Sequence, residues 1–329
     1  MPNETTTAVT APPAPFRDGD LVSLIIFGFN QADIIRPTID AALAQTYPNL
    51  EIILSDNGSS DDTFAVMQQM AAAYDGPHQV RLNQNAAPGL GFIGHVNQAF
   101  DLCRGALIVY NPGDDVSVPH RTAALARTAA ETQALLVHSD VMECGPDGAS
   151  LDKVWSVQPE LEGLTAQDAA RMFALCIGAT CAWRHEVLDR FGPIVETNTY
   201  DDLILYFRAL LAGRVAHVPE PLVRYRTGVG LSHSAALGDT ATERDRMDKL
   251  AGIFALNLST LRQRHMDCVA VGEQAIAQII DKQIARRAYM LRLIETPGFD
   301  AWSRFTSPRA LVMSIRMRRS LRKTLRHVD

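Results

Sequence analysis

The chain has 329 residues, of which 47% are hydrophobic, so it is long enough to bury one large core or two modest ones. Its five cysteines form no Cys-x-x-Cys pair, which is typical of a reduced, cytoplasmic compartment and argues against a zinc site. No apolar run is long enough to span a bilayer, and we expect no secretory signal, because the first residues lack its basic and apolar parts.

Charge is divided unevenly along the chain, whose net charge is −6. Residues 1–235 carry 14 basic and 27 acidic side chains, whereas residues 236–329 carry 17 basic and 10 acidic ones. An acidic front part suits a metal-dependent site, and a basic back part suits an anionic partner such as a membrane surface.

Strands and helices alternate over the first third of the chain. Apolar runs rich in β-branched residues predict strands at 21–29, 50–55, 79–83 and 106–110. Apolar residues at helical spacing predict a helix after each of the first three strands. Asn30 is expected to cap the first helix, and Ser59 with Asp62 resembles a capping box for the second. This alternation predicts an α/β fold with a parallel sheet covered by helices on both faces.

The rest of the chain is predicted as a strand, two helices and an extended stretch, at 134–140, 166–176, 202–212 and 214–226. Beyond about residue 235 the pattern becomes purely helical, so we place a domain boundary there. The first 19 residues are rich in Pro, Thr and Ala, which is typical of a disordered lead. The expected organisation is therefore a lead, an α/β domain and a helical region, at 1–19, 20–235 and 236–329.

Residues 89–94 read GLGFIG, which matches the glycine pattern of a dinucleotide-binding turn. Asp114 also follows at about the distance where a ribose-binding carboxylate would stand. In such folds, however, the first glycine directly follows the first strand, whereas here six residues separate it from the third strand. We therefore interpret these glycines as residues that let a loop bend and a helix pack closely.

Four segments in a fixed order resemble the glycosyltransferase family 2 enzymes, which have the GT-A fold. They read VSLIIFGFN, QTYPNLEIILSDNGSSDDT, LNQNAAPGLGFIGHVNQAFDLCRGALIVYNPGDDVSVP and YDDLILYFRALLAGRVAHVPEPLVRYR. The resemblance covers about residues 21–226. It implies a Rossmann-like nucleotide-binding sheet with helices on both faces, followed by the C-terminal helical region. It also divides the α/β domain into a nucleotide-sugar-binding half at 20–120 and an acceptor half at 121–235.

The resemblance places a divalent cation, Mn²⁺ or Mg²⁺, at Asp114 and Asp115. Both follow an apolar strand, at the sheet edge where α/β folds bind ligands. A cation on a nucleotide-sugar diphosphate needs hard oxygen ligands and neutralises the charge of the leaving group. The resemblance makes Asp115 the direct ligand and places Asp114 on ribose or metal. Pro112 stands where the family's fuller Asp-x-Asp-Asp pattern has its first carboxylate. The alternative to a metal site is that Asp114 and Asp115 belong to a solvated turn.

The resemblance also assigns nucleotide-binding residues. Asp56 matches the aspartate that accepts a hydrogen bond from a ring N–H of the base, which suits uracil, thymine or guanine. The other residues expected on the nucleotide are Phe27, Phe29, Asn30, Asn57, Gly58, His95 and Asp114. His95 stands where a basic residue is common in the family. The alternatives are that Asp56 caps a turn and that Phe29 belongs to an ordinary core.

The acidic pair Asp201 and Asp202 occupies the position of the family's Glu-Asp motif. Arg208 fixes the register, because it follows Asp202 by six residues as in the family pattern. The resemblance makes Asp202 the general base that removes the proton of the acceptor hydroxyl, and Asp201 a residue that orients it. A pair of acids that caps the helix at 202–212 is the alternative.

Arg224, Arg226 and His233 flank the glycine-containing stretch TGVGLSHS. They are candidates for a loop that closes over the diphosphate, with solvated loop charges as the alternative.

The C-terminal stretch LVMSIRMRRSLRKTLRHVD places apolar residues at every fourth position among basic ones. This pattern is typical of an amphipathic helix, so residues 310–329 are expected to bind an anionic membrane surface. The alternatives are a final helix that packs on its own domain and a contact between copies. We expect no nucleic-acid partner, because no aromatic residues interleave with the basic ones.

Together these features predict a metal-dependent, inverting glycosyltransferase. It would move a sugar from a UDP-, dTDP- or GDP-linked donor to a hydroxyl of a saccharide or lipid-linked saccharide, in bacterial surface polysaccharide synthesis. We expect a cytoplasmic protein, which its tail would hold at the inner face of the cytoplasmic membrane. The alternatives are a non-catalytic scaffold that binds nucleotide-sugars, suggested by the altered acidic motifs, and an NAD-dependent oxidoreductase, suggested by the glycine pattern.

Overall fold

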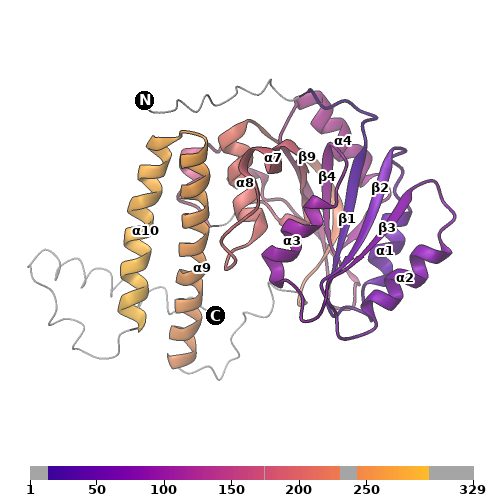
Figure 1. The fold of residues 1–329 in the computed structure, drawn as a ribbon, viewed down its shortest axis with the longest axis horizontal. Coiled ribbons are helices and arrows are strands. Elements are labelled where there is room, and N and C mark those ends of the chain that lie inside the picture. Colours follow the sequence, from indigo (N-terminus) through magenta and orange to yellow (C-terminus); the bar gives the residue numbers. More distant parts are fainter. Residues whose placement is uncertain (1–13, 174, 230–242, 296–329) are drawn as a thin grey trace, which may run out of the picture.

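The computed structural model describes residues 14–173, 175–229 and 243–295, in which the chain forms one mixed sheet with helices on both faces (Figure 1). The strands are β1 (Val22–Gly28), β2 (Leu50–Asp56), β3 (Gln79–Gln84), β4 (Leu107–Pro112), β5 (Val116–Ser117), β6 (Leu136–Cys144), β7 (Ser150–Trp155), β8 (Ala182–Arg184) and β9 (Val215–Arg226). Their order across the sheet is β3-β2-β1-β4-β8-β6-β9-β5, and β7 pairs with β6 beside this path.

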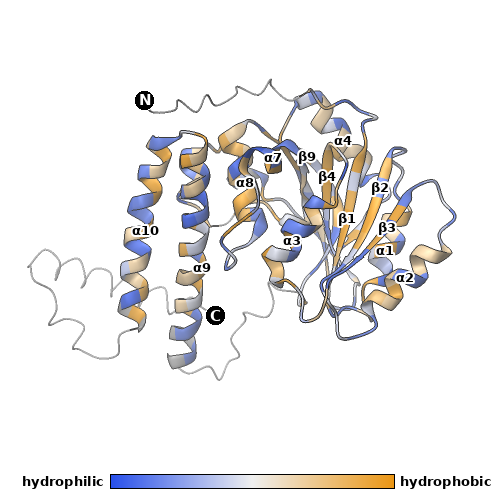
Figure 2. Ribbon diagram, in the orientation of Figure 1, coloured by the Kyte–Doolittle hydropathy of each residue, from blue (hydrophilic) through white to orange (hydrophobic). Residues whose placement is uncertain are grey.

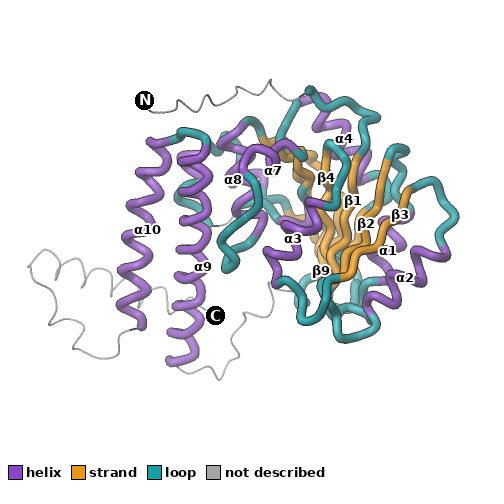
Figure 3. The backbone as a smooth tube through the Cα atoms, viewed as in Figure 1, coloured by secondary structure: helices purple, strands orange, loops and turns teal. Residues whose placement is uncertain are grey.

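The helices pack around this sheet and continue beyond it. They are α1 (Arg36–Leu43), α2 (Thr63–Ala73), α3 (Gly91–Asp101), α4 (Arg121–Thr132), α5 (Gln158–Leu161), α6 (Ala166–Ala169), α7 (Glu186–Phe191), α8 (Asp201–Ala212), α9 (Glu243–Ala270) and α10 (Gln274–Glu295), with a 3₁₀ turn η1 (Gly178–Thr180). Figure 3 shows the strands as one layer between these helices. The expected α/β fold, a sheet with helices on both faces followed by a C-terminal helical region, is therefore confirmed.

The first four strands form the parallel part of the sheet, with β1 between β2 and β4 and with β3 outside β2. Every residue of β1 and β2 is buried, because helices cover both faces. Alternate residues of β1 face opposite sides, so Ile25 packs with Ile93 of α3, whereas Leu24 packs with Ile39 of α1. Figure 2 shows β1 and β2 as mostly hydrophobic. The predicted strands, and helices after the first three, are confirmed.

The sheet beyond β4 departs from the predicted parallel arrangement. β8 pairs antiparallel with both β4 and β6, while β6 and β9 pair parallel to each other. The predicted strand at 134–140 and the extended stretch at 214–226 form β6 and β9. The sheet is mixed because β8, which has only three residues, runs antiparallel to its neighbours, as do β5 beside β9 and β7 beside β6.

Local expectations about helix starts were wrong. Helix α1 begins at Arg36 after the N-cap Ile35, and Asn30 instead adopts a left-handed backbone with φ of 51°. Ser59 does not cap α2, because its hydroxyl donates to Asp56. The helix predicted at 166–176 is reduced to α6, which spans only Ala166–Ala169.

The C-terminal helices share the core of the α/β domain. Helices α9 and α10 lie side by side and continue beyond α8 (Figure 1). Leu261 of α9 and Ile280 of α10 belong to the same buried cluster as Ile25 of β1. A buried ion pair adds to this contact, with Arg208 Nε of α8 2.9 Å from Asp267 Oδ2 of α9. The change of pattern near residue 235 is therefore not a boundary between two cores.

Two predicted features lie outside the described residues: the disordered lead, apart from residues 14–19, and the tail at 310–329. Within the described part of the chain, no helix is long and apolar enough to cross a membrane.

Candidate active site

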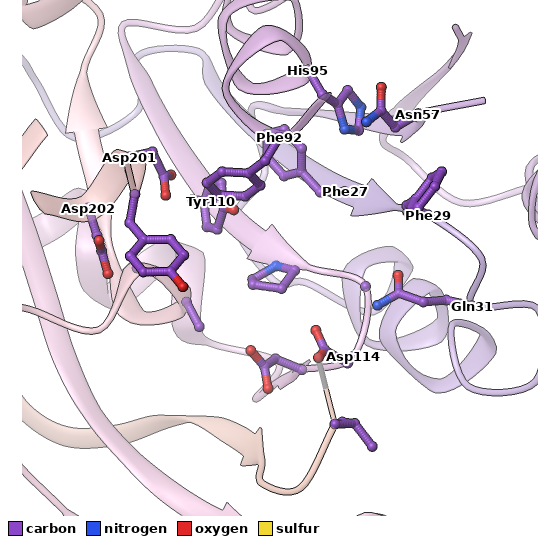
Figure 4. A pocket seen from close by; sticks show the side chains of 18 of the residues that line it. Phe27, Phe29, Gln31, Asn57, Phe92, His95, Tyr110, Asp114, Asp201 and Asp202 are labelled. Atoms are coloured by element: carbon purple, nitrogen blue, oxygen red, sulfur yellow. The ribbon is translucent and has the colours of Figure 1, made fainter. Parts of the chain in front are cut away.

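A cavity of about 790 Å³ opens at the carboxyl ends of β1 and β4, where open α/β sheets bind ligands. The starts of α3 and α8, the η1 turn and the end of β9 complete its wall (Figure 4). The sequence-predicted residues that line it are Phe27, Phe29, Asn57, His95, Asp114, Asp115, Asp201, Asp202 and Arg226. Residues from both predicted halves of the domain therefore meet in one cavity.

The cavity is lined by two pairs of carboxylates, Asp114 with Asp115 after β4 and Asp201 with Asp202 at the start of α8. Tyr110 lies close to all four. Burial raises the pKa of its hydroxyl well above the usual value, and the four negative charges raise it further. Among the described residues that line the cavity, Arg226 is the one lysine or arginine. This excess of negative charge favours binding of a cation.

The carboxylates of Asp114 and Asp115 supply the hard oxygen atoms that Mn²⁺ and Mg²⁺ prefer. Asp115 is only 2% exposed, and its Oδ1 accepts a hydrogen bond from the backbone N–H of Arg226 at 2.9 Å. Burial raises the pKa of Asp115 well above its usual range, and the neighbouring Asp114 raises it further. Burial also raises the pKa of Asp114, and the guanidinium of Arg226 offsets part of that shift.

No group of three or more metal-ligating side chains occurs within the described ranges. Two carboxylates nevertheless fit a cation that takes its other ligands from substrate phosphates and water, as Mg²⁺ often does. Asp114 and Asp115 therefore fit a site that is completed by the substrate.

Arg121, at the start of α4, holds the end of β4 in place. Its side chain is fully buried and donates to Asn111 Oδ1 at 2.7 Å and to the carbonyl of Tyr110 at 2.8 Å. It also donates to the carbonyl of Ala179 in η1 at 2.6 Å, so it joins two walls of the cavity. Sequence analysis did not single out this residue, because a basic residue in the first turn of a helix is usually solvated.

Asp201 and Asp202 differ in electrostatic environment although they are adjacent. Burial raises the pKa of Asp201 to about 8, with a further contribution from the charge of Asp202. Burial raises the pKa of Asp202 only to about 6, because the backbone N–H groups of Leu203 and Gly178 and the charge of Arg264 oppose the shift. Of the two, Asp202 is therefore the more readily ionised and Asp201 the more readily protonated. Among described residues, Asp201 Oδ2 and Asp202 Oδ1 are buried without a hydrogen-bond partner.

Two aromatic side chains and an imidazole form the floor between β1 and α3. The Phe27 ring lies 4.6 Å from that of Tyr110 and 5.0 Å from that of His95. His95 Nε2 is 2.8 Å from Ser55 Oγ. Burial lowers the pKa of His95 to about 4, so the imidazole is neutral and does not supply the positive charge that its position in the sequence suggested.

Asp56 lies beneath the turn after β2 and is fully buried. Its Oδ2 accepts from the backbone N–H groups of Gly58 and Ser59 at 3.1 and 3.0 Å, and its Oδ1 accepts from the Ser59 hydroxyl. It is not among the residues that line the cavity, whereas its neighbour Asn57 is. The structure thus shows the turn-capping arrangement that was the alternative for Asp56.

The glycine pattern at 89–94 serves to place the start of α3. Asn57 Oδ1 accepts from the backbone N–H of Leu90 at 3.0 Å. Gly89 has a φ of 86°, and a Cβ there would lie 2.2 Å from the carbonyl oxygen of Asn57. A side chain at this position would therefore push the loop away, and Gly89 lets the loop approach the β2 turn closely.

Besides Asp56, the sequence-predicted residues Asn30, Gly58 and Arg224 are not among the residues that line the cavity. Asn30 accepts a hydrogen bond from the backbone N–H of Ser60 at 2.8 Å and so fixes the loop instead. Arg224 is exposed and is not among the lining residues, unlike Arg226. His233 lies outside the described residues.

Sequence analysis missed several residues that line the cavity, namely Gln31, Phe92, Tyr110, Ile177 and Tyr200. Phe92 lies inside the glycine pattern, and Tyr200 directly precedes the acidic pair, so position along the chain could have identified both. Gln31 follows β1, and its Oε1 is buried without a partner among the described residues, next to Gly113.

Comparison with known proteins identifies the family. A 28% identical relative over 244 residues is an uncharacterized glycosyltransferase of Nostoc sp., and the match covers 72% of this chain and 73% of that protein. A 33% identical match over 96 residues is the UDP-Glc:α-D-GlcNAc-diphosphoundecaprenol β-1,3-glucosyltransferase WfaP of Escherichia coli; it covers 29% of this chain and 36% of that protein.

Among solved structures, the mannosyltransferase of Pyrobaculum calidifontis in complex with GDP-Man and Mn²⁺ has a similar fold, with a TM-score of 0.51 and 18% identity. The match covers 95% of this chain and 84% of that one. The model of the family described as "Glycosyltransferase like family 2" matches residues 19–237, which include every described residue of the cavity wall. This chain belongs to the glycosyltransferase-like family 2.

Proposed function

We propose that this glycosyltransferase transfers a sugar from a nucleotide diphospho-sugar to a hydroxyl group, with inversion at the anomeric carbon. The observation that carries the proposal is the presence of two carboxylate pairs in one cavity, both close to Tyr110. Asp114 and Asp115 fit a cation, and Asp201 and Asp202 fit proton transfer. A donor bound between them would present its diphosphate to the first pair and its anomeric carbon toward the second.

The donor half of the cavity would hold the nucleotide and its metal. Asp115 and Asp114 would bind Mn²⁺ or Mg²⁺, which when bound neutralises charge on the diphosphate leaving group. Among the described residues that line the cavity, Arg226 is the one that supplies a guanidinium group. Phe27 and Phe29 line the same side, and the half-exposed Phe29 offers a face for stacking of the base. Asp56 contributes indirectly, through the turn that positions Asn57.

The acceptor half would perform the proton transfer. The acceptor oxygen attacks the anomeric carbon, the bond from that carbon to the diphosphate oxygen breaks, and Asp202 takes the hydroxyl proton. Asp202 suits this role because it is the more readily ionised of the two, with its pKa raised to about 6. Asp201, whose pKa is raised to about 8, retains its proton more readily and can donate a hydrogen bond that orients a sugar hydroxyl. Such a pair with separated pKa values is typical of acid and base roles in one site.

The substrate classes are proposed from the relatives. WfaP is named for a UDP-linked glucose donor and a lipid-diphosphate-linked sugar acceptor, and the Pyrobaculum enzyme was crystallised with GDP-Man and Mn²⁺. We infer a UDP-, dTDP- or GDP-linked donor and a saccharide or lipid-linked saccharide acceptor of a bacterial surface polymer. Binding to the inner face of the cytoplasmic membrane through residues 310–329 rests on their basic, amphipathic sequence alone.

A ligand panel tests this proposal. Thermal unfolding is measured with UDP, GDP and dTDP, each with and without Mn²⁺, and with NAD as the competing cofactor. We expect one nucleoside diphosphate to raise the melting temperature in a Mn²⁺-dependent way, because a ligand that binds only the folded state stabilises it. Stabilisation by NAD alone would overturn the proposal. Metal-dependent binding without any hydrolysis of the corresponding nucleotide-sugars would support a non-catalytic binding protein.

A further inference from the structure

An aromatic pair stands on the acceptor side of the cavity, next to the proposed base. Phe92 in the first turn of α3 and Tyr200 immediately before α8 have ring centroids 6.4 Å apart, with an interplanar angle of 74°. Both line the cavity, and Tyr200 is 37% exposed. Figure 4 shows Phe92 and Tyr110 between Asp201 and Phe27. The proposed mechanism uses neither Phe92 nor Tyr200.

The two rings are held at a fixed separation by contacts outside the cavity. Asn97 of α3 donates to the carbonyl of Ile194 at 2.8 Å and accepts from its backbone N–H at 2.9 Å. This reciprocal pair joins the helix of Phe92 to the segment that leads to Tyr200. Next to Tyr200, the hydroxyls of Thr199 and Thr260 lie 2.7 Å apart and join the segment to α9. The aromatic pair is therefore ordered before any ligand binds, which lowers the entropic cost of binding.

The charge of this wall restricts what can bind there. Asp201 and Asp202 are the charged side chains beside the pair, and the described arginine of the cavity, Arg226, lies at the end of β9 beside Asp115. An anionic group placed against the aromatic pair would meet these acids, and Arg264, whose charge acts on Asp202, is fully buried and does not line the cavity. A neutral ring with an apolar C–H face matches both the aromatic surface and the hydroxyl-accepting carboxylates.

We propose that Phe92 and Tyr200 form the binding surface for the accepting sugar and select a neutral pyranose. This inference rests on the proposed glycosyltransferase reaction and specifies its acceptor. One face of the pyranose packs on the rings while a hydroxyl reaches Asp202. Any phosphate of a lipid-linked acceptor must then lie outside the cavity, at least one sugar ring away from the attacking hydroxyl.

Saturation-transfer NMR on the full chain tests this assignment, with Mg²⁺ and whichever of UDP, GDP and dTDP gives the largest thermal shift. The probes are methyl glycosides of glucose, galactose and N-acetylglucosamine, with glycerol 3-phosphate as an anionic probe without a pyranose ring. We expect at least one glycoside to receive saturation on the C–H protons of one ring face. Phe92→Ala and Tyr200→Ala should weaken its binding about three- to tenfold, the range expected for loss of one aromatic contact, and Tyr200→Phe should retain it.

Val195→Ala is the matched control, because Val195 lies in the same segment, is 66% exposed and does not line the cavity. It should bind the glycoside as the parent does. The inference is overturned if no glycoside receives saturation, if glycerol 3-phosphate binds in preference, or if the alanine variants bind as the parent does. Thermal stabilisation by this nucleoside diphosphate and Mg²⁺ should be equal in parent and variants, and the absence of stabilisation of the parent by any of UDP, GDP and dTDP would instead count against the proposed function.

Discussion

The carboxylate of Asp115 accepts a hydrogen bond from the backbone N–H of Arg226 across a sequence separation of 111 residues. This contact ties the end of β9 to the loop after β4. It also means that Asp115 has a structural partner in addition to its proposed metal ligation. Any substitution of Asp115 therefore has to separate the two roles.

Asp115→Asn is expected to remove metal-linked nucleotide binding while preserving the fold. Asparagine keeps the oxygen that accepts from Arg226 but loses the negative charge that a divalent cation requires. Asp115→Ala would in addition leave a buried N–H without a partner, at a cost of about 1–3 kcal/mol. The Mn²⁺-dependent thermal shift with the best nucleoside diphosphate is the measurement, with the exposed Asp40→Asn as control. An unchanged shift in Asp115→Asn would reject the assignment.

Asp202→Asn should lower turnover about 10²- to 10⁴-fold, the usual contribution of a positioned general base. The variant keeps the shape of the side chain, and donor binding should change little because Asp202 faces the acceptor. Asp201→Asn should be milder, since an amide can still donate the orienting hydrogen bond. Transfer to an identified acceptor, or slow hydrolysis of the donor, provides the rate. If Asp201→Asn is inactive and Asp202→Asn is active, the two roles are exchanged.

The pH dependence of kcat/KM should follow the ionisation of Asp202. Burial raises the pKa of this carboxyl to about 6, and only the ionised form accepts a proton. The rate should therefore rise about tenfold per pH unit below pH 6 and level off above it. Rates are measured between pH 5 and 8 at saturating metal, together with the melting temperature in each buffer. A rate that does not change between pH 5 and 7 would contradict this role.

Asp201→Asn should stabilise the folded protein at alkaline pH. The pKa of Asp201 is raised to about 8 in the folded state, chiefly by burial, whereas an unfolded aspartate titrates near 3.9. The folded state therefore binds more protons between these values, and stability falls as pH rises through that window. The melting temperature of the variant, relative to the parent, should rise more at pH 8.5 than at pH 4. Equal differences at the two pH values would show that Asp201 titrates normally.

Removal of residues 310–329 should release the protein from anionic liposomes. The predicted interaction is carried by six basic side chains between Arg316 and Arg326, each contributing about 1 kcal/mol near an anionic surface. Binding of the intact chain should weaken as salt is added, because exposed charges are screened. Co-sedimentation with vesicles is the measurement, and nucleotide binding is the control. Equal sedimentation of both chains would show that the tail does not bind the vesicles. It would favour a helix that packs on its own domain or a contact between copies.

The sequence predicts best where one physical requirement dominates. The strands β1, β2 and β4 are mostly apolar because both of their faces are buried. β2 ends at Asp56, and β4 leads into the loop that bears Asp115. Asp115 and Asp202 were identified by their positions in motifs of the family that the sequence resembles. The family resemblance supplied their roles.

The remaining features depend on contacts between distant parts of the chain. The three-residue β8 carries too little pattern to reveal that it runs against its neighbours. Asp56 was expected to bind the base, yet its carboxylate accepts hydrogen bonds from the backbone N–H groups of Gly58 and Ser59. The local sequence is compatible with both arrangements. His95 was expected to be basic, but its neutrality follows from burial, which only the packed structure reveals.

Arg264 of α9 reaches back to the helix that begins with the proposed base. Its guanidinium donates to the carbonyl of Leu203 at 2.8 and 3.1 Å and to those of Ala169 and Met172 at 2.9 and 2.8 Å. A chimera that took residues 236–329 from a relative would therefore replace the contacts that Arg264 makes with the helix of Asp202. The acceptor half and α9 therefore have to be transplanted together.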